Sequence, residues 1–125
     1  MSKYKGLLDQ KRVSSKELEN LLEARAKDEL AFLLIDVREP YEYEAAHITG
    51  VDLLLPTTEF QTWAPVLAES YGDQTLVLTC RTSNRTAQVQ AILIQMGLTR
   101  VIDHAGGIVE YLGTTEQGME GAKGV

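Results

Sequence analysis

The sequence predicts an α/β protein built on a mainly parallel β-sheet flanked by helices. Short, continuous apolar runs alternate along the chain with segments whose apolar residues recur every three or four positions. The runs are typical of strands buried on both faces, and the periodic segments are typical of helices that cover them. Alternation of the two favours parallel strands joined by helical crossovers. A length of 125 residues suits one compact domain, so we expect a single domain over residues 1–125.

The first elements are a helix, a strand and a short helix. Ser14 and Glu17 have the S-x-x-E spacing of a capping box, and apolar residues at helical spacing follow, which predicts a helix over residues 15–27. Residues 31–37 form a continuous apolar run with β-branched members, which predicts a buried strand. Residues 42–46, after a proline, predict one or two helical turns.

The middle of the chain predicts a second and a third strand around another helix. Residues 51–55 are apolar enough for a strand. The following helix is expected to be capped by Thr57 or Thr58, and Pro65 would kink it because a proline beyond the first turn removes a backbone hydrogen bond. Residues 75–79 form the third apolar run, after turn residues.

The last part predicts a long helix, a fourth strand and a tail. The helix after residue 85 is expected to end at Gly97, since glycine is favoured just beyond a helix. Residues 100–103 predict the fourth strand, and Gly106-Gly107 opens a short helical turn to about residue 112. The tail over residues 113–125 is rich in glycine and polar residues, so we expect it to be mobile.

Composition excludes several classes of function. A net charge of −6 argues against general nucleic-acid binding, which needs lysine and arginine to neutralise phosphates. No apolar stretch approaches a membrane span, and the N-terminus lacks the apolar core of a secretory signal, so we expect a cytoplasmic protein. One cysteine cannot form an internal disulfide, and with only His47 and His104, far apart in sequence, it cannot form a typical zinc site. His104 is expected at the surface or in a loop.

The stretch around Cys80 points to chemistry. It reads as a strand, a tight polar loop and a helix, and Cys80 leaves the carboxyl end of the strand, the edge where open α/β sheets bind ligands. The helix N-terminus favours an anion, and Arg81 and Arg85 add positive charge without an acidic residue between positions 74 and 95. Such a setting favours a reactive thiolate that attracts anionic substrates. The alternative is an inert cysteine that fills the core.

Four motifs resemble the successive signatures of rhodanese domains, in the family's order and at its spacings, over about residues 12–112. They are D-V-R-E-P-Y-E-Y at 36–43, H-I-T-G at 47–50, the cysteine loop at 80–86 and G-G-I at 106–108. The resemblance implies a five-stranded parallel sheet flanked by helices, with Cys80 as the nucleophile. The cradle it implies consists of Arg81, Thr82, Ser83, Asn84, Arg85 and Thr86.

The resemblance also assigns supporting residues and shows departures. Asp36 and Arg38 match family positions that support the site from the end of a neighbouring strand. His47 matches a family position near the loop that connects to the next strand. We expect Asp36 and His47 to act as scaffold. Ser83 stands where the family often has glycine, and its side chain could narrow the cradle or stiffen the loop against positive φ. Tyr111 stands where tryptophan is frequent.

The activity implied by the resemblance is sulfur transfer. Cys80 would take sulfur from a small anionic donor such as thiosulfate, hold it as a persulfide, and pass it to cyanide, a thiol or a sulfur-carrier protein, without a metal or organic cofactor. A persulfide carrier and a binding module are alternatives that use the same loop. Cysteine phosphatases and arsenate reductases have a C-x5-R loop, one residue longer than the spacing from Cys80 to Arg85, so this reading is less favoured. The oligomeric state stays open.

Overall fold

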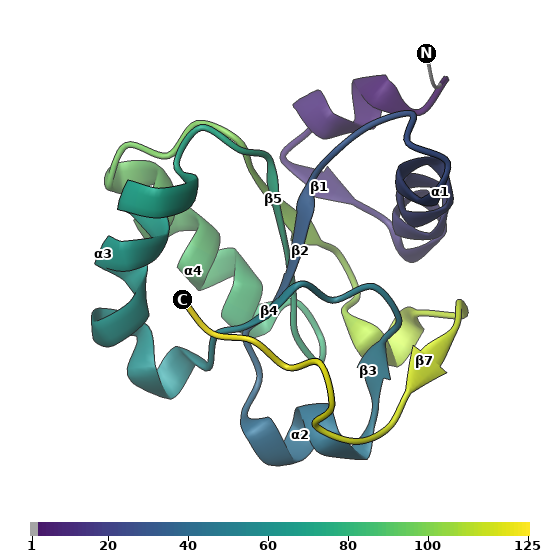
Figure 1. Ribbon diagram of the computed structural model, residues 1–125. Coiled ribbons are helices and arrows are strands. Elements are labelled where there is room, and N and C mark those ends of the chain that lie inside the picture. Colours follow the sequence, from purple (N-terminus) through teal and green to yellow (C-terminus); the bar gives the residue numbers. More distant parts are fainter. Residues whose placement is uncertain (1–2) are drawn as a thin grey trace.

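The computed structural model describes residues 3–125 and contains the predicted five-stranded parallel sheet (Figure 1). Its strand order is β1-β6-β5-β2-β4, and every pairing between neighbours is parallel. The strands are β1 (Arg12–Val13), β2 (Leu33–Asp36), β4 (Leu53–Leu54), β5 (Leu76–Thr79) and β6 (Val101–His104). The fold class expected from the sequence is confirmed, and β5 lies at the centre of the sheet.

Helices cover both faces of the sheet. The α-helices are α1 (Ser15–Ala26), α2 (Pro40–Ala45), α3 (Phe60–Tyr71) and α4 (Asn84–Gln95), and the 3-10 helices are η1 (Lys5–Asp9), η2 (Thr57–Glu59) and η3 (Ile108–Glu110). Successive strand residues point to opposite faces. Ile35 and Leu78 therefore pack with α3 and α4, whereas Leu34 and Val77 pack with α1. This explains why the strands are continuous apolar runs.

Two of the helix ends predicted from the sequence are confirmed, and the prediction for a third is wrong. Ser14 and Glu17 form the capping box of α1, and Gly97 adopts φ +105° directly after the C-cap of α4. The expectation for Thr57 and Thr58 is wrong, because neither caps α3: both lie in η2 before its start, and no side-chain cap is present at either helix.

Pro65 lies inside α3, which nevertheless continues to Tyr71. The buried side chains of Trp63, Ala64 and Leu67 surround the proline in sequence and pack into the core beneath the sheet. Burial of a large apolar side chain such as Leu67 contributes about 1.5–3 kcal/mol, which offsets the hydrogen bond that a proline removes.

Three short strands, β1, β3 (His47–Ile48) and β7 (Thr115–Glu116), were not predicted from the local sequence patterns. β1 is the fifth strand of the sheet and is only two residues long, and β3 pairs antiparallel with β7. The tail that contains β7 also donates a hydrogen bond from the Gly118 amide to the carbonyl of Glu44. The tail is therefore held beside α2, which its composition did not indicate, and its mobility stays a prediction.

His104 is the clearest correction. It is fully buried at the end of β6, where one ring nitrogen lies 2.8 Å from the hydroxyl of Ser15 and the other 2.8 Å from that of Thr79. Burial lowers the pKa of His104 to about 4. A histidine after an apolar run was expected in a loop, but its two polar partners allow it to extend the strand into the core. Within residues 3–125, every helix is too short or too polar to cross a bilayer.

Candidate active site

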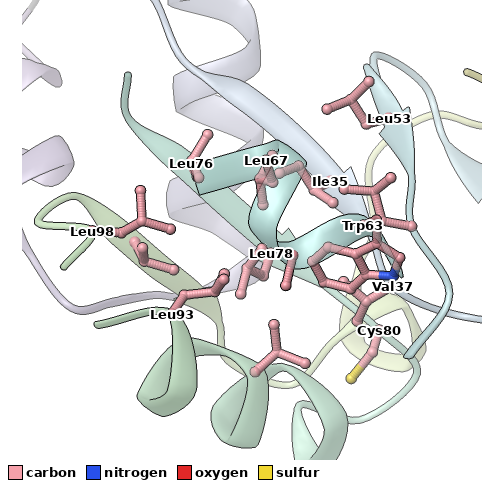
Figure 2. Close-up of a cluster of buried hydrophobic side chains, with 14 residues drawn as sticks. Ile35, Val37, Leu53, Trp63, Leu67, Leu76, Leu78, Cys80, Leu93 and Leu98 are labelled. Carbon is pink, nitrogen blue, oxygen red and sulfur yellow. The ribbon is translucent and has the colours of Figure 1, made fainter. Parts of the chain in front are cut away.

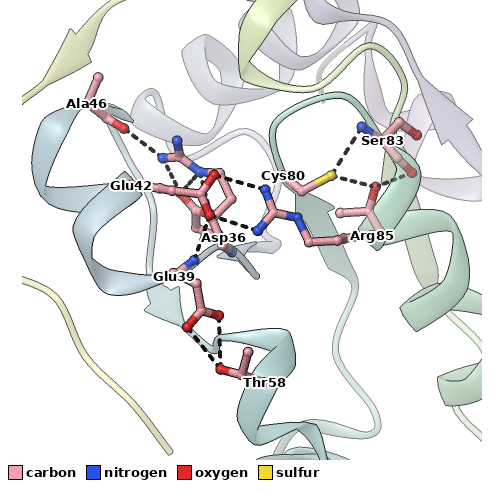
Figure 3. Close-up of polar contacts among 10 residues, drawn as sticks. Asp36, Glu39, Glu42, Ala46, Thr58, Cys80, Ser83 and Arg85 are labelled. Carbon is pink, nitrogen blue, oxygen red and sulfur yellow. Dashed lines mark hydrogen bonds and ion pairs between the residues drawn. The ribbon is translucent and has the colours of Figure 1, made fainter.

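Cys80 directly follows the central strand β5, at the carboxyl edge of the parallel sheet. Its carbon atoms belong to the apolar cluster that also contains Val37, Trp63 and Val89 (Figure 2). The residue is only 1% exposed, so the thiol is covered at this edge of the sheet. The sulfur nevertheless points to the polar loop that leads into α4, not into the hydrocarbon core (Figure 3).

Two polar groups of the loop contact the sulfur. The amide of Ser83 donates a hydrogen bond to Sγ at 3.1 Å, and the hydroxyl of Thr86 lies 3.6 Å from it. Ser83 occupies the N-cap position of α4, which has no side-chain cap in the described chain. Helix N-terminal amides carry partial positive charge and bind anions. The cysteine sulfur thus accepts the N-cap amide of α4, the amide that an N3 side chain accepts in a capping box, and this suits a thiolate or a persulfide.

Ser83 adopts the left-handed conformation, with φ +81°, that glycine usually supplies. Its hydroxyl donates to the carboxylate of Asp103 at 2.7 Å, so the side chain is directed to β6 while the amide is directed to the sulfur. The side chain therefore does not narrow the cradle, and it does not keep the loop from positive φ. The Ser83 side chain thus holds the loop through its hydrogen bond to Asp103, on the side away from the sulfur.

Asp103 is a residue of the site that the sequence analysis did not identify. Its carboxylate is 1% exposed and accepts hydrogen bonds from the hydroxyls of Ser83 and Thr86, and it pairs with Arg12 at 3.2 Å. These donors satisfy the hydrogen-bonding capacity of a polar group that is shielded from water. The signal for it was an acidic residue at the carboxyl end of a predicted strand, the same edge from which Cys80 emerges.

The loop carbonyls are turned away from the sulfur by the segment after β6. The amide of Ile108 donates to the carbonyl of Cys80 at 2.9 Å, and that of Val109 donates to the carbonyl of Arg81 at 3.1 Å. Gly107 has φ +62°, and a Cβ there would collide with both carbonyl oxygens. The Gly-Gly-Ile motif is therefore needed for close backbone approach, and it holds the loop so that an amide faces the sulfur.

The two arginines do not surround the sulfur as expected. Arg85 directs its guanidinium to Glu42 of α2, with two hydrogen bonds of 2.7 and 2.9 Å (Figure 3). This pair holds the pKa of Glu42 at about 2 and raises that of Arg85. Arg81 is exposed and makes no ion pair within residues 3–125, and Thr82 and Asn84 are also exposed.

Asp36, Arg38 and His47 make structural contacts outside the cysteine loop. Asp36 accepts three hydrogen bonds from the guanidinium of Arg38, which also donates to the carbonyl of Ala46 at 2.6 Å. His47 stacks on Tyr43 with ring centroids 3.7 Å apart, and its Nδ1 lies 2.9 Å from the Tyr43 carbonyl. These contacts join β2, α2 and β3. No group of three or more potential metal ligands gathers within the described residues.

Comparison with known proteins adds the family to this geometry. The family model of the rhodanese-like domain matches residues 14–114. The chain is 39% identical over 80 residues, 62% of its length, to 26% of the rhodanese-like/PpiC domain-containing protein 12 of Arabidopsis thaliana. It is 32% identical over 99 residues, 79% of its length, to 24% of the probable adenylyltransferase/sulfurtransferase MoeZ of Mycobacterium tuberculosis. The chain thus spans about a quarter of these two relatives.

Solved structures share the fold at lower identity. A thiosulfate sulfurtransferase from Pseudomonas aeruginosa matches with a TM-score of 0.72 and 20% identity, over 90% of this chain and 22% of that one. A rhodanese-related protein from Thermoplasma volcanium matches with a TM-score of 0.67 and 24% identity, over 82% of this chain and 91% of that one. With the matched family model and the cysteine loop in place, the chain belongs to the rhodanese-like domain family.

Proposed function

We propose that this chain is a sulfurtransferase that carries sulfur on Cys80 as a persulfide. The donor is a sulfane-sulfur compound such as thiosulfate, and the acceptor is a thiophile: cyanide, a thiol or a sulfur-carrier protein. A reducing compartment such as the cytoplasm suits this chemistry, because it keeps a single cysteine available as a thiol. No metal or organic cofactor takes part in the proposed steps.

The observation that supports this proposal most is the hydrogen bond from the Ser83 amide to the sulfur at the start of α4. An inert core cysteine has no need of such a donor, whereas a thiolate and a persulfide are anions that the helix N-terminus stabilises. In the closed loop, the Ser83 amide is held toward the sulfur by the buried Asp103 carboxylate and by the segment after β6.

The reaction runs in two steps, each of which breaks one sulfur–sulfur bond and forms one new bond to the transferred sulfur. The Cys80 thiolate attacks the outer sulfur of thiosulfate, a new S–S bond forms, and the bond within the donor breaks with its electron pair leaving on sulfite. An acceptor thiolate or cyanide then attacks the outer sulfur of the persulfide and releases the Cys80 thiolate. This two-step course is typical of nucleophilic covalent catalysis.

Burial of Cys80 requires the loop to open before a donor reaches the sulfur. The outer side of the loop is formed by Arg81, Thr82 and Asn84, which are exposed. Motions of surface loops on the microsecond to millisecond scale gate many active sites. The closed loop would then keep the persulfide away from solvent between the two steps.

Mass spectrometry of the intact chain tests the proposal. Wild type treated with a panel of sulfane-sulfur donors, thiosulfate included, is expected to gain the mass of one sulfur atom, and a reductant should remove it. Cys80→Ser is expected to show no gain while keeping the circular dichroism of wild type. If the wild type stays unmodified with every donor, the proposed sulfur transfer is wrong.

A persulfide carrier without turnover of its own is the second candidate, and the 1% exposure of Cys80 favours it. A buried persulfide reacts slowly with small acceptors such as cyanide and is released when a protein partner opens the loop. Steady-state turnover of thiosulfate and cyanide separates the two candidates. Sustained turnover supports the enzyme, whereas one sulfur loaded and held until a carrier protein is added supports the carrier.

A further inference from the structure

The charges beside the cysteine loop are unusual for a site that binds a dianion. Three arginines near it are each matched with a carboxylate: Arg12 with Asp103 at 3.2 Å, Arg38 with Asp36 at 2.8 Å, and Arg85 with Glu42 at 2.7 Å. Arg81 is the cation of the loop that has no ion pair among the described residues. The positive charge left for a substrate is therefore small.

A second contact, besides the pair with Arg85, holds the side chain of Glu42 in place. One of its carboxylate oxygens also accepts the amide of Glu39, which completes the capping box of α2. Its side chain is 15% exposed, so solvent screens the pair only partly. The carboxylate stays ionised throughout the neutral range, because its pKa is about 2. An anion that approaches Arg85 therefore meets a fixed negative charge as well.

A hollow of about 240 Å³ lies beside Arg85, between α4 and the segment formed by η2 and the start of α3. It is lined by apolar side chains, Phe60, Val89 and Ile92, and by polar ones, Thr57, Gln88 and Arg85. Arg85 belongs to the cysteine loop and Val89 to the buried cluster that contains Cys80, so the hollow lies next to this loop. Pockets for drug-sized ligands measure about 300–1,000 Å³, so this one suits a single small organic group.

We propose that Glu42 determines donor specificity by occupying Arg85, so that the site selects an organic hydropersulfide over the thiosulfate dianion, with the organic group in the hollow beside Arg85. This inference rests on the proposed function and narrows its donor. The Cys80 thiolate attacks the outer sulfur of R–S–SH, the donor S–S bond breaks, and its electron pair leaves on the inner sulfur as the thiolate RS⁻. The proton stays on the transferred sulfur. Nothing is oxidised or reduced overall.

Electrostatics gives the direction of the preference. Thiosulfate brings two negative charges to a thiolate, and the leaving sulfite keeps both, whereas a hydropersulfide brings one at most. Interactions between charges several ångströms apart remain strong where solvent is partly excluded. A site whose arginine is already paired with a carboxylate therefore discriminates against the dianion. An apolar hollow adds affinity for the organic donor.

The test compares rates of Cys80 persulfide formation, measured by quenched-flow mass spectrometry, for thiosulfate and for benzyl hydropersulfide generated in situ. Each rate is compared between variants within one donor, because the two donors differ in intrinsic reactivity. Glu42→Gln keeps the size and hydrogen-bonding capacity of the side chain and removes its charge. It is expected to raise loading from thiosulfate about tenfold, the scale of one nearby charge, and to leave loading from benzyl hydropersulfide within twofold.

Matched variants control for structural damage. Glu44→Gln removes a charge from an exposed position of the same helix, and should change neither rate. Ile92→Ser removes an apolar wall of the hollow and should slow only benzyl hydropersulfide, about fivefold. Ile94→Ser is its control, since Ile92 and Ile94 are equally exposed, both 43%, and Ile94 lies outside the hollow.

The outcomes separate this inference from the proposed function. If neither donor loads Cys80 in wild type, sulfur transfer itself fails. If both donors load wild type and Glu42→Gln leaves the thiosulfate rate unchanged or lowers both rates together, the specificity role of Glu42 is wrong. If Glu42→Gln does not fold, Ile92→Ser decides: equal slowing for the two donors, or none, overturns the inference.

Discussion

Ser83 combines two opposing contributions to stability, and two substitutions separate them. The hydroxyl donates to the buried carboxylate of Asp103, which stabilises the fold, whereas φ +81° strains any residue that has a Cβ. Ser83→Ala removes the hydrogen bond and keeps the strain. Ser83→Gly removes both. The comparison shows whether serine is tolerated at a glycine position because Asp103 holds its side chain.

The expected magnitudes follow from the contacts. A hydrogen bond to a charged group contributes about 1.5–3 kcal/mol, so Ser83→Ala should be destabilised by about 2 kcal/mol. Relief of the left-handed strain returns about 1–2 kcal/mol in Ser83→Gly, and the greater freedom of glycine in the unfolded chain offsets about 0.4–1 kcal/mol of this. Ser83→Gly should therefore be more stable than Ser83→Ala by roughly 0.5–1 kcal/mol and still less stable than wild type.

Urea unfolding followed by the fluorescence of Trp63, the one tryptophan of the sequence, measures these differences. Ser70, exposed within α3, is the control position, because in a helix alanine is more stable than glycine and the order of the two variants should reverse. Both Ser83 variants should still load sulfur, since the amide donor remains. An alanine variant as stable as wild type would refute the role of the Asp103 contact, and a glycine variant no more stable than alanine would refute the strain.

Two further predictions concern stability and the backbone of the loop. The free energy of unfolding should fall by about 2 kcal/mol between pH 7 and pH 5, because His104 has a pKa of about 4 when folded against 6.5 when exposed, so the unfolded chain binds the additional proton. Urea unfolding at the two pH values checks this, and His104→Asn should flatten the difference even if it is less stable at both. Gly107→Ala should destabilise the chain and abolish sulfur loading, because the Cβ meets the carbonyl of Arg81. Gly97→Ala, also at positive φ but with nothing within 4 Å, should cost only the strain of about 1–2 kcal/mol, and equal effects of the two would contradict the close approach.

The central part of the fold was predictable because its signals are local. The strands β2, β5 and β6 are buried on both faces, so each is a continuous apolar run in the sequence. The capping box at Ser14 and the glycine after α4 mark helix ends by the chemistry of single turns. Each of these features depends on residues within about one helical turn of one another.

The elements that were missed depend on contacts between distant segments. β1 is a strand because Arg12 and Val13 pair with the end of β6, more than 80 positions later, and two residues carry no periodicity. β7 likewise forms only against β3. Such short strands form only where a neighbouring strand offers a free hydrogen-bonding edge. The composition of the tail does not reveal this edge, and it therefore predicted a mobile segment.

The same cause explains the errors at the site. The sequence has no acidic residue between positions 74 and 95, which suggested free arginines, yet Glu42 reaches Arg85 from 43 positions away. His104 is buried because Ser15, 89 positions away, supplies one of its two polar partners. Charge and hydrogen-bond satisfaction are summed over space, so a pattern along the chain predicts which groups need partners but not which groups provide them.

The proposed preference of the site for an anionic sulfur therefore has a different origin from the one the arginines suggested. A carboxylate, Asp103, is the charged group that organises the loop, and it repels an anionic sulfur. It is useful there because it orients Ser83, whose amide then faces the sulfur with its partial positive charge. Fixed dipoles hold an anion without attracting counter-charges from solvent, and they favour one sulfur atom over a large polyanion. Under the proposed function, a site built in this way suits a persulfide and leaves donor selection to the side chains around it, which is where Glu42 and the hollow beside Arg85 lie.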